Sequence, residues 1–129
     1  MATPEQIAEV AKHYLIACIW VDCPEGTHPR APIATQRAAF DRCKAFIDAH
    51  LGLFNLAMDR AEVRYGSHPD AGSAEAAFGH DLYLTTAGHG TGFWDREELD
   101  ADDLGDRLTD TCRAFGEPCP TFYRGWLYL

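Results

Sequence analysis

The residues best able to do chemistry lie together in one segment, residues 79–96. It contains two histidines, two aspartates, four glycines, one arginine and a Phe-Trp pair. Imidazole and carboxylate groups can ligate zinc, manganese or iron, and an imidazole near a carboxylate can act as a general base. The spacing fits no standard metal or catalytic pattern. The candidate metal ligands are His80, Asp81, His89 and Asp95.

The expected geometry argues against a shared metal ion in this segment, and the residue types argue against a hydrolytic site. Residues 81–85 and 91–94 have the composition of strands, so the sequence predicts a β-hairpin over 81–95 with His89 near its tip. A strand rises about 3.3 Å per residue, which places His80 more than ~10 Å from His89 unless the hairpin bends. The segment also contains no serine, and its threonines are weak nucleophiles without an activating base.

The same residues also have a structural interpretation. Asp95 and Arg96 can pair with each other at the end of the hairpin. Phe93 and Trp94 are neighbours, so in a strand their side chains point to opposite faces. One aromatic ring then enters the core while the other stays near solvent.

Charge is distributed unevenly along the chain. The net charge is −9, from 11 basic and 20 acidic residues, which disfavours direct binding to the phosphates of nucleic acids. Residues 95–117 contain nine acidic residues and three arginines, a net charge of −6. Such a run is typical of a solvated helix face, and it also suits a surface that competes for a basic partner.

A protein-contact patch combines this acidic run with the exposed end of the hairpin. Trp, Tyr and Arg commonly anchor protein interfaces. The predicted binding residues are His89, Phe93, Trp94, Asp95, Arg96, Asp102, Asp103, Asp106 and Asp110.

Helices are expected before the segment. Thr3, Pro4 and Gln6 form a capping box with proline at the first helical position, which predicts a first helix that ends near residue 21. Apolar spacing predicts a second helical stretch from about residue 35 to 63, either as one bent helix or as two helices interrupted at Gly52. Residues 74–78 are expected to form a short helical turn.

One further helix and a β element are expected after the segment. Asp100 or Asp102 is predicted to cap the helix, and Gly116 to end it. Residues 121–128 have the pattern of one strand, or of a hairpin that turns at Arg124-Gly125.

This order of elements predicts an α+β fold. N-terminal helices would pack on a small antiparallel sheet, made of the hairpin 81–95 and the C-terminal strand or hairpin, with one further helix. The 129 residues are expected to form a single domain over residues 1–129.

The chain has the features of a cytoplasmic protein. Its longest apolar run, residues 14–21, is too short to cross a bilayer. The N-terminus lacks the basic start and apolar core of a signal peptide. Five cysteines, an odd number without a C-x-x-C pair, indicate reduced thiols.

The whole chain resembles a known protein family, and the resemblance is clearest in five short motifs. They are G-H-D at 79–81, L-T at 84–85, G-H-G at 88–90, G-F-W-D-R at 92–96 and L-G-D-R-L-T at 104–109. In these motifs the chain resembles a family of small tailed-phage and prophage proteins of uncharacterised function. The resemblance implies a phage origin, and it supplies no activity.

The sequence therefore predicts a small acidic, phage-like accessory protein that acts by protein binding and not as an enzyme. It would serve host takeover, as an inhibitor of a host defence protein or of a nucleic-acid-binding protein. The expected partner is a host or phage protein with a basic surface, with no cofactor, no membrane contact and no direct nucleic-acid contact. The alternative is a small metal-binding protein or hydrolase centred on the His/Asp hairpin. The oligomeric state stays open.

Overall fold

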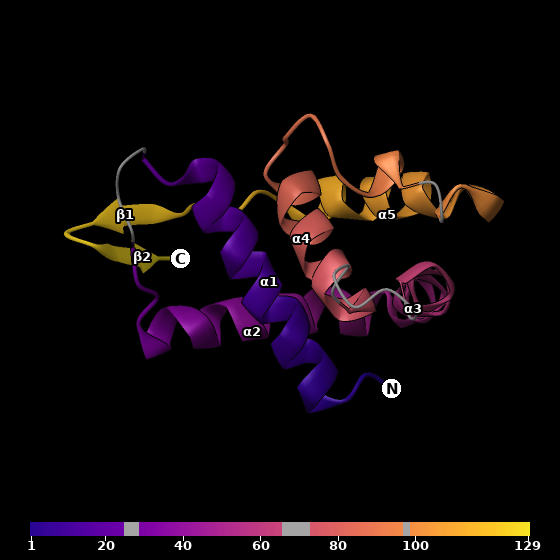
Figure 1. The fold of residues 1–129 in the computed structure, drawn as a ribbon, viewed down its shortest axis with the longest axis horizontal. Helices are drawn as coiled ribbons and strands as arrows, with labels where there is room; N and C mark the ends of the chain where they lie inside the picture. The colour runs from indigo at the N-terminus through magenta and orange to yellow at the C-terminus, as the bar shows by residue number, and fades with distance from the viewer. Residues whose placement is uncertain (25–28, 66–72, 97–98) are drawn as a thin grey trace.

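The computed structural model describes residues 1–24, 29–65, 73–96 and 99–129, and this part of the chain is mostly helical (Figure 1). The helices are α1 (Pro4–Asp22), α2 (Ile33–Ala49), α3 (Leu51–Tyr65), α4 (Ala74–Thr86) and α5 (Leu104–Phe115). Two 3-10 turns, η1 (Phe93–Asp95) and η3 (Ala101–Asp103), lie between α4 and α5. The strands are β1 (Thr121–Tyr123) and β2 (Trp126–Tyr128).

The start of α1 confirms the predicted capping box. The Gln6 backbone N–H donates to Thr3 Oγ1 at 3.1 Å, and the Thr3 backbone N–H donates to Gln6 Oε1 at 3.0 Å. These bonds satisfy two groups that a helix start leaves without partners. Neither α1 nor any other helix in the described residues combines the length and apolar character needed to span a membrane.

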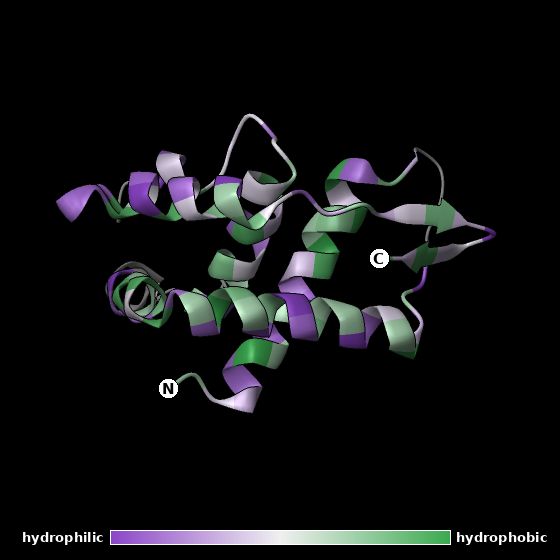
Figure 2. Ribbon diagram, turned by 180° about the vertical axis from the view of Figure 1, so that it is seen from behind, coloured by the Kyte–Doolittle hydropathy of each residue, from purple (hydrophilic) through white to green (hydrophobic). Residues whose placement is uncertain are grey.

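The second helical stretch consists of two helices, with the break at a position other than the one predicted. The chain leaves helical geometry at His50 (φ −131°, ψ 40°), and Gly52 lies inside the first turn of α3. The His50 N–H donates to the carbonyls of Phe46 and Ile47, at 3.1 and 3.2 Å, so that α2 ends with its last turn hydrogen-bonded. Figure 2 shows polar and apolar residues alternating around α2.

The predicted hairpin over 81–95 is wrong, because residues 74–86 form helix α4. Ser73 Oγ accepts from the Ala76 N–H at 3.1 Å and caps the start of this helix. All six residues from 81 to 86 are buried. A short run that is buried on every side has no period, so its composition does not separate a strand from a buried helix. Residues 91–94 likewise form a loop and part of η1 instead of a strand.

Helices α1 and α4 cross at close range and form the centre of the molecule (Figure 1). Gly79 makes this possible, since a Cβ atom at this position would lie 2.1 Å from the carbonyl oxygen of Val10. Further along the same contact, the rings of Tyr14 and Tyr83 meet edge to face with centroids 5.1 Å apart. The segment that the sequence predicted as a surface hairpin is therefore the central helix of the fold.

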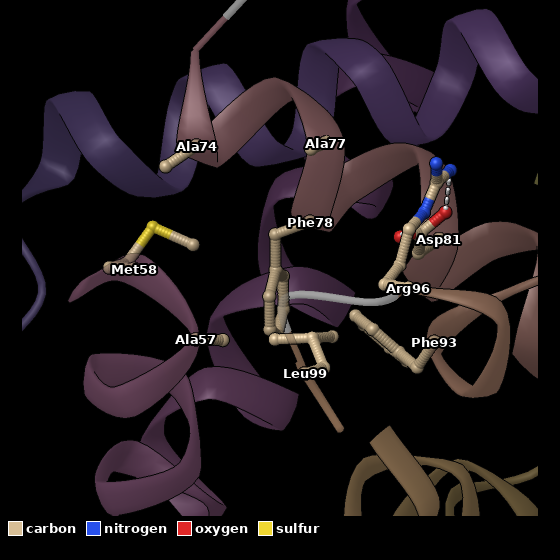
Figure 3. A pocket seen from close by; sticks show the side chains of 9 residues that line it. All are labelled: Ala57, Met58, Ala74, Ala77, Phe78, Asp81, Phe93, Arg96 and Leu99. Carbon is tan, nitrogen blue, oxygen red and sulfur yellow. Dashed lines mark hydrogen bonds and ion pairs between the residues drawn. The ribbon is translucent and has the colours of Figure 1, made fainter. Parts of the chain in front are cut away.

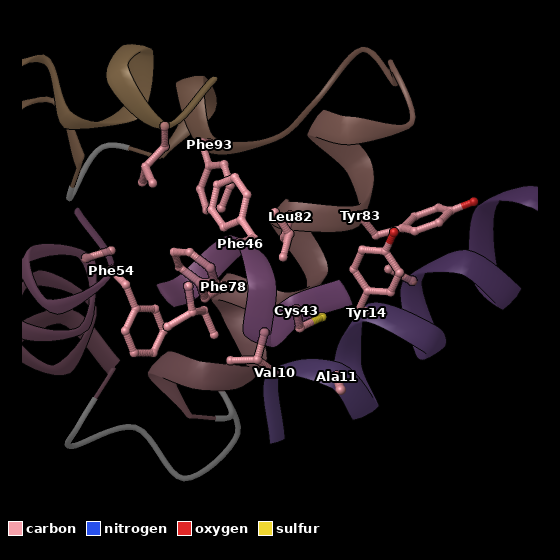
Figure 4. Packing of buried hydrophobic residues seen from close by; sticks show 14 of the residues in the cluster. Val10, Ala11, Tyr14, Cys43, Phe46, Phe54, Phe78, Leu82, Tyr83 and Phe93 are labelled. Carbon is pink, nitrogen blue, oxygen red and sulfur yellow. The ribbon is translucent and has the colours of Figure 1, made fainter. Parts of the chain in front are cut away.

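The main core is a cluster of phenylalanines from four elements (Figure 4). The Phe78 ring on α4 lies 5.0 Å from Phe54 on α3, 5.0 Å from Phe93 on η1 and 6.3 Å from Phe46 on α2, measured between centroids. Edge-to-face and tilted contacts at these distances are favourable beyond the area they bury. The cluster fixes η1, and with it the neighbouring loop, against the helices.

The C-terminal hairpin confirms that part of the β prediction, but the helices do not pack on it as on a sheet. β1 and β2 pair antiparallel and lie beside the start of α2 (Figure 1). Leu127 is fully buried, and its N–H donates to the Arg30 carbonyl at 2.8 Å while its carbonyl accepts from Thr35 Oγ1 at 2.7 Å. The predicted α+β fold is thus corrected to a helical fold with a small two-stranded hairpin, because the core forms between helices.

Candidate functional site

Asp81 forms a buried ion pair. Its side chain lies on α4 and is 3% exposed. Arg96 Nε donates to Asp81 Oδ2 at 2.7 Å and Arg96 Nη2 donates to Oδ1 at 2.6 Å, a two-point contact (Figure 3). A cavity of about 20 Å³ beside this pair has room for little more than one water molecule. Asp81 and Arg96 therefore hold η1 to α4.

The loop after α4 is fixed by two short-range contacts. Asp95 Oδ2 accepts from the Gly92 N–H at 3.2 Å, and Thr85 Oγ1 accepts from the Phe93 N–H at 3.2 Å. A Cβ atom at Gly92 would lie 2.2 Å from Thr85 Oγ1, so only glycine fits there without a shift. Asp95 thus acts as a local cap for the Gly92 N–H, a role that the sequence G-F-W-D alone does not distinguish from that of a metal ligand.

His80 lies on the exposed side of α4 against Trp20. The ring centroids are 5.5 Å apart, and Trp20 is 72% exposed. Burial lowers the pKa of His80 below its ordinary value, an effect that the nearby Asp81 carboxylate opposes. His80 is thereby kept neutral near pH 7.

His89 is oriented by a residue that the sequence did not indicate. Its Nε2 lies 3.2 Å from the carboxylate of Asp22 at the end of α1. The same carboxylate accepts a short hydrogen bond from Tyr83 Oη. Burial, and then the bond to Asp22, raise the pKa of Tyr83, so the phenol stays protonated. Asp22 and His89 are 67 positions apart, so only the crossing of α1 and α4 reveals the pair.

The structure does not bring the four candidate metal ligands together. Asp81 is paired with Arg96, and Asp95 caps the loop. His80 contacts Trp20 and His89 contacts Asp22, two different residues in the last turn of α1. Among the described residues, no three or more His, Cys, Asp or Glu side chains form a group that could hold a metal ion.

A larger cavity, of about 310 Å³, opens between the end of α4, the following loop and the second half of α5. We call it the Trp94 cavity. The residues that line it and that bear on its chemistry are Thr85, Thr86, His89, Trp94, Thr109, Arg113 and Glu117.

The threonine hydroxyls of the Trp94 cavity are all bonded to the backbone. Thr86 Oγ1 donates to the Leu82 carbonyl at 2.7 Å, and Thr109 Oγ1 donates to the Gly105 carbonyl at 2.8 Å. Thr85 Oγ1 accepts from a backbone N–H, as described above. Within the described residues no hydrogen bond joins any of them to His89. An imidazole held by a carboxylate suits general-base catalysis, but this cavity presents it no positioned hydroxyl nucleophile.

The two neighbouring aromatic residues have different environments. Phe93 is 1% exposed and belongs to the core, whereas Trp94 is 37% exposed at the edge of the cavity. Gly105 lets α5 pack closely here, because a Cβ atom there would lie 2.6 Å from the Phe93 carbonyl oxygen. Of this predicted pair, the residue that can meet a partner is Trp94.

The predicted acidic residues divide into two groups. Asp102 Oδ2 accepts from Arg60 Nη2 on α3 at 2.8 Å, so its charge is partly balanced. Asp103, Asp106 and Asp110 are exposed. The η3 turn and Asp103, which makes no side-chain cap, precede α5, so neither Asp100 nor Asp102 caps this helix directly.

Two of these carboxylates lie on the side of α5 that borders the cavity. Asp106, Asp110 and Arg113 recur at the spacing of one helix face, and Arg113 lines the cavity. Glu117, just after the helix, is also exposed and lines it. We call Asp106, Asp110 and Glu117 the acidic stripe. Arg113 Nη1 lies 3.6 Å from Asp110 Oδ1, an exposed contact that contributes little to stability.

Comparison of the chain with protein-family models, curated proteins and solved structures finds no match. The resemblance to tailed-phage proteins therefore stays a prediction.

Proposed function

We propose that this protein acts by binding a partner protein with a basic surface, through Trp94 and the acidic stripe. The observation that carries the proposal is the placement of Trp94. This large aromatic side chain is partly exposed and lines the same cavity as Glu117 and Arg113. The exposed carboxylates of Asp106 and Asp110 share a face of α5 with Arg113. Aromatic residues anchor interfaces, and complementary charge steers association.

The backbone that carries Trp94 is fixed before any partner arrives. Phe93 is packed in the phenylalanine core, and its N–H is bonded to Thr85 Oγ1. Arg96, two residues after Trp94, is held by Asp81. Binding through a residue on such a support loses little conformational freedom, which favours affinity.

The biological role follows from charge and resemblance. A net charge of −9 suits competition for a basic surface, such as one that binds nucleic acid. Together with the likeness to tailed-phage proteins, this supports a phage accessory role in host takeover. The partner would be a host defence protein or a nucleic-acid-binding protein of host or phage, bound in the host cytoplasm.

Reversing charge on the stripe tests the proposal. The immobilised Asp106→Lys/Asp110→Lys variant should capture less of the partner from a lysate of phage-infected bacteria than the unchanged protein does. Capture by the unchanged protein should fall as salt rises, because exposed charges are screened over about 10 Å at 0.1 M salt. The readout is quantitative mass spectrometry of the captured proteins.

A matched control separates the stripe from net charge. Asp41 and Asp59 are exposed on α2 and α3, and neither lines the Trp94 cavity. The Asp41→Lys/Asp59→Lys variant changes net charge by the same amount and should capture the partner as the unchanged protein does. Equal capture by all three proteins, or equal loss in both variants, would contradict binding through the stripe.

A further inference from the structure

The side chains that line the Trp94 cavity indicate which chemical group the cavity can bind. We propose that the cavity binds the guanidinium group of an arginine side chain on the partner. This inference deepens the proposed function, because it identifies the side chain that the partner inserts beside Trp94. The cavity volume, about 310 Å³, lies at the lower end of the range for small-molecule sites.

The hydroxyls of the cavity present acceptors. Thr86 and Thr109 direct their hydroxyl hydrogens to backbone carbonyls of their own helices. A hydroxyl oxygen that donates in this way still has lone pairs with which to accept. The Thr86 hydroxyl also interacts with the Tyr14 side chain. The Thr109 oxygen is therefore the acceptor available to a ligand, whereas its donor capacity is already used.

Two ionisable side chains at the cavity, Glu117 and His89, also bear on which ligand it can bind. The Glu117 carboxylate accepts only, and it makes no hydrogen bond or ion pair within the described part of the chain. When the ring proton of His89 is on Nε2 and is donated to Asp22, Nδ1 is left as an acceptor. A ligand that fits these groups must supply several donors and positive charge.

Arginine meets these requirements better than lysine. The face of the Trp94 ring is electron-rich and attracts a cation placed over it. A guanidinium is planar, stacks on an indole and carries five N–H donors in a fixed array, whereas an ammonium is a compact and strongly hydrated point charge. Arg113 opposes a second cation, but its side chain is 76% exposed and lies beside Asp110, so it can remain in solvent.

Nuclear magnetic resonance of the full chain tests this inference without the partner. The protein has three tryptophans, Trp20, Trp94 and Trp126, and each gives one indole N–H signal. Titration with Nα-acetyl-arginine amide should shift the Trp94 signal saturably, with a dissociation constant of roughly 1–10 mM. The other two signals should stay in place. Nα-acetyl-lysine amide should bind several-fold more weakly. The Trp94→Phe variant assigns the signal.

Two pairs of variants locate the contact. Glu117→Gln should weaken binding of the arginine amide about threefold, and Glu5→Gln, on an exposed residue of α1, should leave it unchanged. Thr109→Val, which removes the acceptor, should weaken binding more than Thr109→Ser, which keeps it. No saturable shift at Trp94, equal binding of the lysine amide, or unchanged binding by both Glu117→Gln and Thr109→Val would overturn the inference.

The arginine-amide titration and the capture experiment test different claims, so either can fail alone. If the stripe variant loses its partner while the arginine amide fails to shift Trp94, the binding surface stands and the arginine pocket is wrong. If the arginine amide binds as expected while stripe and control variants capture alike, the pocket stands and the proposed surface is wrong.

Discussion

Residues 79–96 comprise the greater part of helix α4 and the loop that follows it, and the two parts use similar side chains differently. On α4 the aspartate is buried and held at two points by Arg96. In the loop, Trp94 and His89 reach the edge of a cavity, although the backbone beneath them is bonded to α4. A segment rich in reactive side chains thus divides into a part that stabilises the fold and a part that faces solvent. Residue type alone did not separate them.

The neighbouring aromatic residues give the sharpest test of this division. Phe93→Ala should lower the free energy of unfolding by about 4 kcal/mol, because it empties a filled core site. Trp94→Ala should lower it by less than about 1 kcal/mol, since substitutions at the surface have small effects. Chemical denaturation measures both. Similar losses for the two variants would show that Trp94 belongs to the core as well.

The Asp81–Arg96 ion pair is expected to give the next largest effect. Arg96→Ala removes the cation that lies against a buried carboxylate and should cost about 3 kcal/mol. Joint replacement by similar-sized apolar residues, Asp81→Leu with Arg96→Met, should restore most of that loss. Thermal melts of the three proteins provide the comparison. A single variant as stable as the unchanged protein would mean that the pair is not structural.

The glycine at the helix crossing should have an intermediate effect. Gly79→Ala places a methyl group against the Val10 carbonyl and should destabilise the fold by about 2 kcal/mol through separation of α1 and α4. Gly52→Ala is the control, because no atom lies within 4 Å of a Cβ at that helical position. It should stabilise the protein by about 0.5–1 kcal/mol. If both variants have the same stability, the helices are not in close contact at Gly79.

Replacement of His80 should have the smallest effect, which should appear in the pH dependence of the free energy of unfolding. Burial lowers its pKa in the folded protein, so between its ordinary value of 6.5 and the lower folded value the unfolded chain binds more protons. The free energy of unfolding should therefore fall as the pH drops below 6.5. Denaturation at pH 7.5 and 5.5 should show a smaller fall for His80→Gln. An identical fall in both proteins would assign the dependence to other groups.

Local signals in the sequence were sufficient for some elements. The capping box at Thr3 and Gln6 predicts α1 because its partners are three residues apart. The pattern of residues 121–128 predicts one strand or a hairpin that turns at Arg124-Gly125, and the structure has the hairpin. Both turn residues have positive φ (51° and 81°), as such tight turns require.

Other features depend on contacts between distant parts of the chain. Helix α4 has no apolar period to detect, because the residues from 81 to 86 are buried on all sides. The partner of His89, a loop residue, is Asp22 at the end of α1. The pattern of acidic residues around Asp106 was visible in the sequence, but its position beside the Trp94 cavity depends on how α5 packs against η1.

The crossing of α1 and α4 also bears on how the molecule assembles. Its contacts join residues far apart in sequence, as in the Gln6–Glu75 and Asp22–Tyr83 hydrogen bonds, which span 69 and 61 positions. Closing so long a loop has an entropic cost that neighbouring helices in a hairpin avoid. We therefore expect α1 to dock late, after α2 and α3 have folded back. Folding should then be slower than the roughly microsecond-to-millisecond times of bundles built from local contacts.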